Sequence, residues 1–270
     1  MVTRMIHDSN IAETLFVSTK TGVAFRVVLK CGCTYLKNLL WHFDHDVPHP
    51  LGNAIHKRDR DLPRSIGQSI EDVRRNPYAF IVLRDPVERF LSLYFDKVVR
   101  AGEGRFQVLR DAVANEPGFI PDARTPDAHR QNCFVTLAWV RANLARETPQ
   151  APNPHWNRQM VTVRSSLPLG LKVRTLNGLD SQLRFLLSDH VPDLERHLAG
   201  AKWRNRAPRL FSSADILNDE LVAEIIRLYR RDAANWTKAD AMWRDIDRRA
   251  RDLDAIPRLG RDIADDRDRD

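Results

Sequence analysis

Cysteine is scarce in this chain of 270 residues, which has only Cys31, Cys33 and Cys133. A small, odd number of cysteines argues against a disulfide framework and is typical of a reducing compartment. Long apolar runs are also absent, because no stretch approaches the roughly 18 apolar residues of a membrane-spanning helix. The first twenty residues are interrupted by polar side chains and lack the apolar core of a signal peptide. We therefore expect a cytoplasmic protein with no transmembrane segment.

Charged residues of both signs are plentiful, with 43 Lys and Arg against 36 Asp and Glu, a formal net charge of +7. This surplus favours anionic partners such as nucleotides, nucleic acid, sulfated or phosphorylated substrates, or acidic membrane surfaces, and does not distinguish among them. From Arg248 onward, seven Arg are balanced by seven Asp, unlike the polybasic arms that bind nucleic acid or acidic lipid. We predict one domain over residues 1–247 and a charged, flexible tail over residues 248–270.

Apolar runs separated by turn residues predict alternating strands and helices. A β-hairpin is expected over residues 14–30, and further strands over residues 79–83 and 171–175. Helices are expected over residues 34–43, from Pro86 behind an Asp85 N-cap, and over residues 133–145, 181–187 and 213–236, with a loop over residues 44–65. Two strand–loop–helix units followed by helices predict an α/β fold of three layers, a mainly parallel sheet flanked by helices.

The segment LKCGCTYLKN, residues 29–38, joins a predicted strand to a predicted helix. A structural zinc site needs four ligands in pairs such as C-x₂₋₄-C, and a redox pair is usually C-x-x-C, so C-x-C fits neither. An anion-binding loop fits better, because Gly32 permits a tight turn, the helix N-terminus favours negative charge, and Lys30 and Thr34 add donors. The Walker A sequence G-x-x-x-x-G-K-[ST] is absent. The alternative is a plain strand–helix turn with a surface lysine.

The segment IVLRDPVERFLSLYFDKVV, residues 81–99, repeats this arrangement of strand, basic residue and helix start. Arg84 stands where it could make a bidentate contact with a phosphate, and Ser92, two helical turns later, could donate to the same group. The alternative makes Arg84 an ion-pair partner of Asp85 or Glu88, and Ser92 a residue of the helix surface. Because ligands of parallel sheets bind at the carboxyl ends of the strands, both loops are expected at one edge.

Together these two segments resemble the motifs of the PAPS-dependent carbohydrate sulfotransferases, which include Golgi chondroitin and dermatan sulfotransferases and bacterial relatives. The family's first motif, Pro-Lys-x-Gly-Cys-Thr-Ser-Leu-Lys, is matched at Lys30, Gly32, Cys33, Thr34, Leu36 and Lys37. Leu29 replaces the proline and Tyr35 the serine, which removes one hydroxyl. The second motif, Arg-Asp-Pro-x-x-Arg-φ-x-Ser-x-Tyr (φ apolar), is matched at Arg84, Asp85, Pro86, Arg89, Ser92 and Tyr94. Weaker similarities at residues 153–156 and 225–232 extend the resemblance to roughly residues 14–236.

This resemblance implies the P-loop-like sulfotransferase fold, PAPS (3′-phosphoadenosine 5′-phosphosulfate) as sulfuryl donor, a carbohydrate-like acceptor and no metal. Lys30 is expected to stabilise charge on the leaving group during in-line transfer. Arg84 and Ser92 are expected to hold the 3′-phosphate. The 5′-phosphosulfate is expected on the first loop, at Lys30, Cys31, Gly32, Cys33, Thr34, Tyr35 and Lys37.

The acceptor hydroxyl needs a general base, and nine histidines compete for that role. His56 lies between the two motifs, where related sulfotransferases often carry a catalytic histidine, and its neighbours Lys57 and Arg58 are expected to depress its pKa. His155 is the second candidate and His42 the third, while Asp and Glu bases stay open. For each histidine the alternative is a loop or surface role.

Two other functional classes compete with a sulfotransferase. A P-loop kinase or nucleotide hydrolase would share the strand–loop–helix logic, but the Gly-Lys-[ST] step is missing. A non-enzymatic anion-binding or nucleic-acid-binding module would explain the positive charge, but no nucleic-acid-binding motif is recognised. We therefore predict a sulfotransferase with an intracellular carbohydrate or glycoconjugate acceptor and no nucleic-acid partner. A small glycoside, a lipid-linked sugar and another metabolite all stay open as the acceptor.

Overall fold

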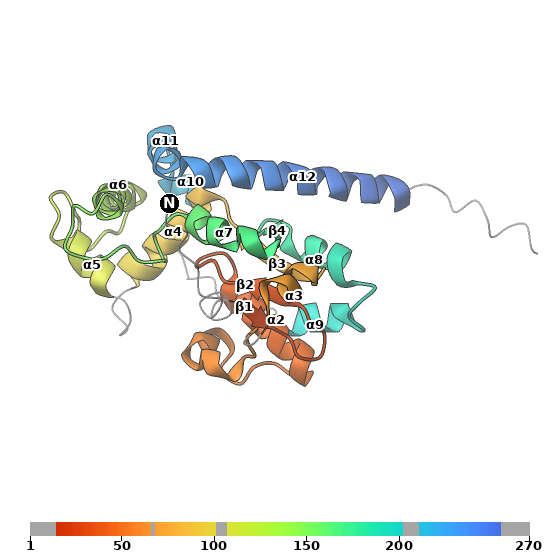
Figure 1. Cartoon of the computed structure of the whole chain (residues 1–270). Coiled ribbons are helices and arrows are strands. Elements are labelled where there is room, and N and C mark those ends of the chain that lie inside the picture. The colour runs from red at the N-terminus through yellow and green to blue at the C-terminus, as the bar shows by residue number, and fades with distance from the viewer. Residues whose placement is uncertain (1–14, 66–67, 101–106, 202–210, 255–270) are drawn as a thin grey trace, which may run out of the picture.

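The computed structural model describes residues 15–65, 68–100, 107–201 and 211–254 (Figure 1). Four strands form one sheet in the order β1-β2-β3-β4: β1 (Leu15–Val17), β2 (Ala24–Arg26), β3 (Ala79–Leu83) and β4 (Lys172–Thr175). The hairpin partners β1 and β2 are antiparallel, whereas β2, β3 and β4 are mutually parallel. The predicted α/β fold with a mainly parallel sheet is confirmed.

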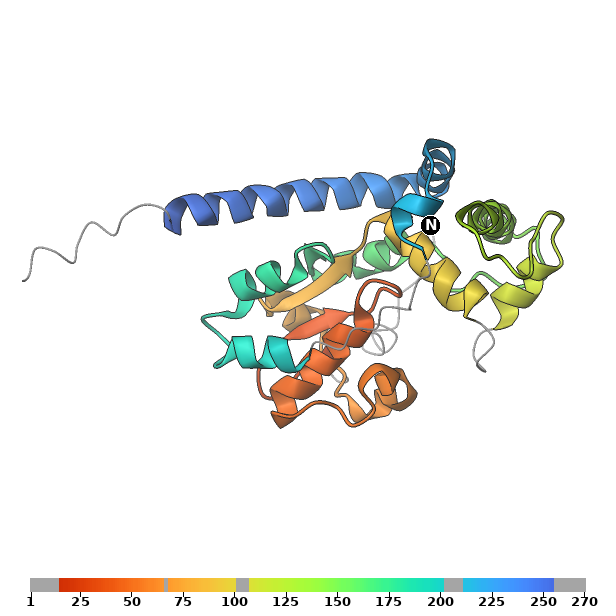
Figure 2. The same ribbon diagram turned by 180° about the vertical axis from the view of Figure 1, so that it is seen from behind.

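Helices follow each parallel strand. Between β2 and β3 lie α2 (Cys33–His45), the 3₁₀ segment η1 (Gly52–Asp61) and α3 (Ile70–Arg75). Between β3 and β4 lie α4 (Pro86–Tyr94), the π turn η2 (Phe95–Val99), α5 (Gln107–Ala114), α6 (Pro126–Leu144), α7 (Gln159–Ser166) and the 3₁₀ turn η3 (Leu167–Leu169). After β4 come α8 (Leu179–Leu187), α9 (Leu194–Gly200), α10 (Ser213–Ile216), α11 (Asp219–Leu228) and α12 (Arg230–Asp254). Figures 1 and 2 show α12 running along one side of the molecule.

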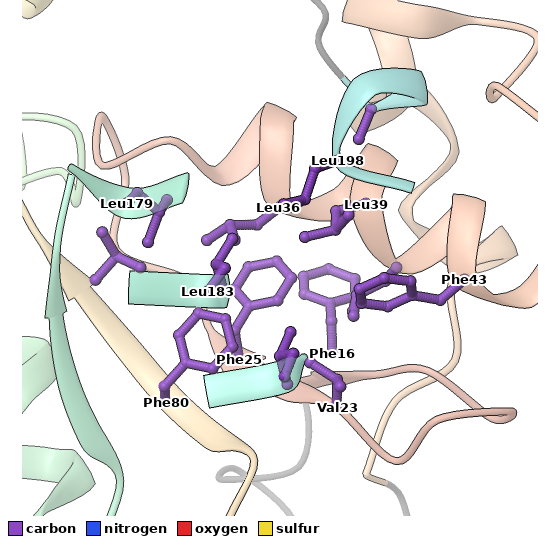
Figure 3. Packing of buried hydrophobic residues seen from close by; sticks show 14 of the residues in the cluster. Phe16, Val23, Phe25, Leu36, Leu39, Phe43, Phe80, Leu179, Leu183 and Leu198 are labelled. Atoms are coloured by element: carbon purple, nitrogen blue, oxygen red, sulfur yellow. The ribbon is translucent and has the colours of Figure 1, made fainter. Parts of the chain in front are cut away.

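The two faces of the sheet follow from the alternation of side chains along each strand. Phe16, Phe25 and Phe80 point to one face, where their rings stack with centroid separations of 5.7 Å and 6.2 Å. This face is covered by α2 and α8, which contribute buried residues such as Leu36 and Leu183 (Figure 3). The face therefore fixes α2, and with it the loop that precedes α2, against the sheet.

The opposite face is covered more thinly. Leu15, Ala24 and Ala79, the strand neighbours of the three phenylalanines, pack there against Val73 of α3 and Leu169 of η3. Helices thus lie on both sides of the sheet, which gives three layers.

A second core lies beyond β3, where α4 packs against α6 and α11. Leu91, Val140 and Ile225 are buried in it, together with Trp156 from the segment before α7. The Trp156 indole N–H donates to Asn143 Oδ1 at 2.7 Å. The backbone carbonyl of Trp156 accepts a hydrogen bond from the Tyr229 hydroxyl at 2.8 Å. This second core therefore anchors the residues around His155.

Three sequence predictions need comment. The predicted loop over residues 44–65 is only partly a loop, because it contains η1. The single helix predicted over residues 213–236 is wrong: the chain forms α10, α11 and α12, separated by an extended Asn218 whose side chain caps α11 and by a non-helical Tyr229. Helix α12 continues to Asp254, past residue 247, and residues 255–270 lie outside the described part, so the division at residue 247 stays a prediction.

Within the described ranges, none of the helices combines the length and the apolar character that a membrane span requires.

Candidate active site

The loop between β2 and α2 turns through two left-handed residues. Lys30 has φ 69°, and Gly32, the N-cap of α2, has φ 79°. The positive φ of Gly32 favours glycine, and a Cβ there would lie 2.7 Å from Leu176 Cδ1, so the end of that flexible side chain would have to shift. The first N–H groups of α2 have no acceptor within the helix and, with the helix dipole, favour an anion at this end.

Lys30 projects from this loop into a cluster of charges. Its ammonium forms an ion pair with Asp96 of η2, and the same carboxylate oxygen lies 3.2 Å from Lys97 Nζ. Burial lowers the pKa of Lys30, while Asp96 opposes that shift. Burial acts to raise the pKa of Asp96, but the two lysines hold it below its ordinary value. The site thus contains a half-buried ammonium neutralised by one carboxylate, which an incoming anion could replace.

Arg84 brings the second loop to the first. Its Nη1 donates to the Lys30 carbonyl at 3.1 Å, and its Nη2 lies 3.6 Å from Glu88 Oε2, the ion pair that the alternative interpretation expected. The Gln159 side chain pairs with the Arg84 backbone, accepting its N–H at 2.9 Å and donating to its carbonyl at 2.8 Å. The Cys31 thiol also donates to Gln159 Oε1, at 3.1 Å. One amide therefore ties the two loops together, and the predicted meeting of the loops is present.

Two other residues of the second motif, Arg89 and Tyr94, make hydrogen bonds to neighbouring segments of the chain. Buried Arg89 donates from Nε to the Leu29 carbonyl at 3.1 Å, and from Nη2 to the carbonyls of Pro154 and His155 at 3.2 Å and 3.4 Å. The Tyr94 hydroxyl is buried 2.8 Å from His129 Nδ1. Arg89 thus fixes the segment that carries His155 beside the loop that carries Lys30.

His56 lies over the start of α2. Its Nε2 is 2.7 Å from Thr34 Oγ1 and 3.8 Å from Cys33 Sγ, and its Nδ1 is 2.8 Å from Lys37 Nζ. Burial and the charge of Lys37 lower the pKa of His56 to about 4. We expected the depression from Lys57 and Arg58; the structure attributes it to burial and to Lys37. His56 is therefore neutral near pH 7.

His155 lies in the same charge cluster but reaches it from the segment before α7. Its Nδ1 is 2.7 Å from Asn153 Oδ1. Burial and then the charges of Lys97 and Lys30 lower its pKa to about 4 as well. Two neutral histidines thus lie near Lys30, on different elements.

Other predicted residues have structural partners. The Tyr35 hydroxyl donates to Asp180 Oδ1 of α8 at 2.8 Å, so it packs α2 against α8. Lys37 is buried beneath η1 and contacts both carboxylate oxygens of Asp59 at 2.7 Å and 2.8 Å. Burial raises the pKa of the Cys31 thiol to about 12. The Tyr35 and Lys37 side chains thus contact other protein groups, and their predicted contact with an anion stays a prediction.

Two predicted residues lie further along their helices. Ser92 is half-buried on α4. His42, in the last turn of α2, is buried with its Nδ1 2.8 Å from His197 Nδ1 of α9. His42 is thus placed as a packing residue between α2 and α9.

Sequence reasoning missed several polar residues of the site. The acidic and amide residues are Asp59, Asp96, Asn153 and Gln159, and the basic one is Lys97. Asp96 and Lys97 directly follow the second motif, and Asn153 precedes His155 by two residues, a spacing typical of an Asx turn. Gln159 had no local signal, because its role depends on contacts across the fold.

No group of three or more His, Cys, Asp or Glu side chains gathers as a metal site within the described residues. The three cysteines are free thiols.

Comparison with known protein families agrees with this geometry. A family model described as "Sulfotransferase family" matches residues 13–163, more than half of the chain. The chain therefore belongs to the sulfotransferase family, and the activity of its class is sulfuryl transfer. The matched range contains both loops, His56 and His155. Searches of curated proteins and of solved structures find no match.

Proposed function

We propose that this protein transfers the sulfuryl group of PAPS to a hydroxyl of a carbohydrate-like acceptor. The observation that carries the proposal is the contact between the two loops, in which Arg84 Nη1 lies 3.1 Å from the Lys30 carbonyl. The contact sets two cationic residues, a left-handed glycine turn and a helix N-terminus at one edge of the sheet. Such an edge suits a ligand that has an anionic group at each end.

The donor would lie across both loops. The Thr34 hydroxyl and the first N–H groups of α2 would bind the 5′-phosphate, together with the backbone of residues 31–35. Arg84 and Ser92 would bind the 3′-phosphate. Gln159 and Arg89 would hold the two loops in register, and Lys37 would hold η1, with His56, against the start of α2.

Lys30 would carry the electrostatic part of the chemistry. The acceptor oxygen attacks sulfur as the bond from sulfur to the bridging phosphate oxygen breaks, and negative charge grows on that oxygen. An ammonium that leaves Asp96 for the bridging oxygen stabilises charge that is present only in the transition state. A nearby neutral imidazole, His56 or His155, would accept the proton of the acceptor hydroxyl.

The carbohydrate class of the acceptor is supported by the two motifs and by their similarity to carbohydrate sulfotransferases. A cytoplasmic location is supported by the three free thiols, which suit a reducing compartment. The balanced charges after residue 248 support an acceptor other than nucleic acid.

A thermal-denaturation titration tests the donor. Adenosine 3′,5′-bisphosphate, the donor without its sulfuryl group, should stabilise the protein by about 2.7 kcal/mol at a concentration of 100 times its Kd. ATP with Mg²⁺, a ligand of the competing nucleotide-kinase class, should produce a much smaller effect. Stabilisation by ATP and Mg²⁺ without stabilisation by the bisphosphate would exclude the sulfuryl donor proposed here.

A further inference from the structure

Two ammonium groups share one carboxylate oxygen beside the loop before α2. Asp96 Oδ2 forms an ion pair with Lys30 Nζ and lies 3.2 Å from Lys97 Nζ. These three side chains carry two positive charges and one negative charge, a net charge of +1. His56 and His155, which lie near them, have pKa values of about 4 and add no charge near pH 7. The Asp96 cluster (Lys30, Asp96 and Lys97) therefore attracts one further anionic group.

The backbone of Asp96 is held in place by the π turn η2, a kind of turn that is frequent at functional sites. Phe95 and Val98 of this turn are buried in the second core. Arg110 of α5 donates from Nη1 to the carbonyls of Val98 and Val99, at 3.0 Å and 3.3 Å. Because η2 is fixed by its core residues and at its last carbonyls, the position of the Asp96 carboxylate is set by the fold.

Lys30 is the member of the Asp96 cluster that is able to move. A lysine side chain is a flexible four-carbon stem with three rotatable donors, so its ammonium reaches different acceptors without movement of the backbone. The ion pair is half-buried, since 13% of the Lys30 side chain and 34% of the Asp96 side chain are exposed. An anion that reaches the Asp96 cluster would therefore meet Asp96 in a fixed position and Lys30 in an adjustable one.

Lys97 lowers the cost of moving Lys30. Breaking an ion pair away from bulk water leaves an uncompensated charge, which is strongly unfavourable. Here the Asp96 oxygen that Lys30 would leave also contacts Lys97, so the carboxylate keeps a counter-charge. Lys30 would gain a phosphate oxygen in exchange. The net contribution of Lys30 to binding is then the difference between two ion pairs, and Asp96 competes with the ligand for the ammonium.

We propose that Asp96 is a positioning residue that competes with the 5′-phosphate of the product for the ammonium of Lys30, and so promotes release of adenosine 3′,5′-bisphosphate. This inference rests on the proposed function. The product phosphate bears one more negative charge than the phosphate of PAPS, because the former bridging oxygen keeps the electron pair of the broken S–O bond. Release of so anionic a product is the step that a competing carboxylate assists, and product release limits the turnover of many enzymes.

Asp96→Asn tests the competition, because it keeps the shape of the side chain and removes its charge. Calorimetry with the full chain should find the Kd for adenosine 3′,5′-bisphosphate lowered by about tenfold or more, the usual strength of a hydrogen bond to a charged group. Surface plasmon resonance should attribute this gain to slower dissociation. A merely structural role of Asp96 would weaken binding. An unchanged or raised Kd in Asp96→Asn therefore overturns the proposal.

Asp46→Asn is the matched control, since Asp46 is an exposed carboxylate that also pairs with two basic residues, Lys20 and Arg196. It should bind the bisphosphate like the parent. An equal gain in Asp46→Asn would mean that net charge alone sets the affinity, and it overturns the role given to Asp96. Circular dichroism checks the folding of each variant. Asp96→Ser, which is also neutral, gives the same test if Asp96→Asn does not fold.

A double variant shows whether Asp96 acts through Lys30. In the background of Lys30→Ala, Asp96→Asn should bring little gain in affinity, because no ammonium remains to be exchanged. A gain of the same size without Lys30 would mean that Asp96 repels the ligand directly, and it overturns the exchange. Failure of the parent to bind the bisphosphate would overturn the proposed function, and this inference with it. Equal binding by the parent and Asp96→Asn would overturn this inference alone.

Discussion

At the scale of single residues, the chemistry depends on how Lys30 is neutralised. Asp96 lies against both Lys30 and Lys97, so its carboxylate neutralises two ammonium groups. In the proposed mechanism, Lys30 leaves this carboxylate for the departing oxygen of the sulfuryl donor. The ammonium is half-buried, so its interaction with a developing charge is screened less than it would be in water.

Lys30→Ala should therefore lower kcat by roughly 100- to 1,000-fold, the loss usual for removing one group that stabilises transition-state charge. Binding of adenosine 3′,5′-bisphosphate should weaken only modestly, because Lys30 acts mainly in the transition state. Steady-state kinetics and calorimetry measure the two effects. Lys20→Ala, at an exposed ion pair with Asp46, is the control and should behave like the parent. Transfer by Lys30→Ala at the parental rate would remove Lys30 from the mechanism.

Arg84→Ala should weaken ligand binding more than it lowers kcat, the opposite of Lys30→Ala. The loss of a charge-assisted contact to the 3′-phosphate should weaken binding of the bisphosphate by roughly 1.5–3 kcal/mol. Adenosine 5′-phosphate, which lacks the 3′-phosphate, should bind the parent and Arg84→Ala with similar affinity, and calorimetry with both ligands makes this comparison. If Arg84→Ala weakens both ligands equally, Arg84 acts through the Lys30 loop instead.

Acid should destabilise the fold through two histidines that are neutral in the folded chain, His56 and the half-buried His155. Burial lowers the pKa of His56 and of His155 from 6.5 to about 4, so the unfolded chain binds more protons than the folded chain in this interval. Their contribution is fully present above pH 6.5 and is lost as the pH falls toward 4. Urea unfolding across this pH range should show that the free energy of unfolding falls less steeply with decreasing pH in His155→Gln than in the parent. Equal slopes would mean that His155 is not held neutral.

At the scale of elements, the site is built by two turns that end parallel strands. The loop before α2 needs left-handed backbone at Lys30 and Gly32, and α4 begins at Asp85, whose side chain accepts the N–H groups of Val87 and Glu88. Both turns place a helix N-terminus at the same edge of the sheet. The geometry of this edge therefore depends on local backbone chemistry as much as on the core.

Gly32→Ala tests this dependence. The left-handed conformation costs a non-glycine residue roughly 1–2 kcal/mol, and moving the Leu176 side chain off its rotamer adds roughly 0.5–1.5 kcal/mol. Gly22→Ala is a matched control, because Gly22 has φ 67° and nothing within 4 Å of its Cβ, so only the conformational cost applies. Urea denaturation should find Gly32→Ala the less stable of the two. Equal stabilities would mean that Leu176 moves aside at no cost.

Elements with strong local signals could be predicted from the sequence. The apolar run of β3 and the Asp-Pro start of α4 gave their positions correctly, since the signal and the structure lie in the same residues. The sequence predicts one helix where the structure has α10, α11 and α12. The helical spacing of apolar residues continues across Asn218 and Tyr229, although the backbone is not helical at these two residues. The hairpin of β1 and β2 could be predicted, whereas the register of β2, β3 and β4, the Gln159 bridge and the Asp59–Lys37–His56 chain could not, because each joins residues separated by many positions in the sequence.

At the scale of the whole molecule, the site lies where two cores meet. One core holds α2 and α8 against the sheet, and the other packs α4, α6 and α11. Arg89 crosses between them, from the Leu29 carbonyl to the segment of His155, and Asp232 of α12 accepts the N–H groups of Gln159 and Met160 at 2.8 Å and 2.9 Å. The relative position of the two cores therefore sets the distance between the loop before α2 and His155.

The central claim, that one donor lies across both loops, is tested most directly by a crystal structure of the chain with adenosine 3′,5′-bisphosphate. The account predicts the 5′-phosphate at the N-terminus of α2, within hydrogen-bonding distance of Thr34, and the 3′-phosphate on Arg84 and Ser92, with Lys30 turned from Asp96 toward the 5′-phosphate. A bisphosphate bound away from either loop, or bound there with Arg84 directed away from it, would contradict the account.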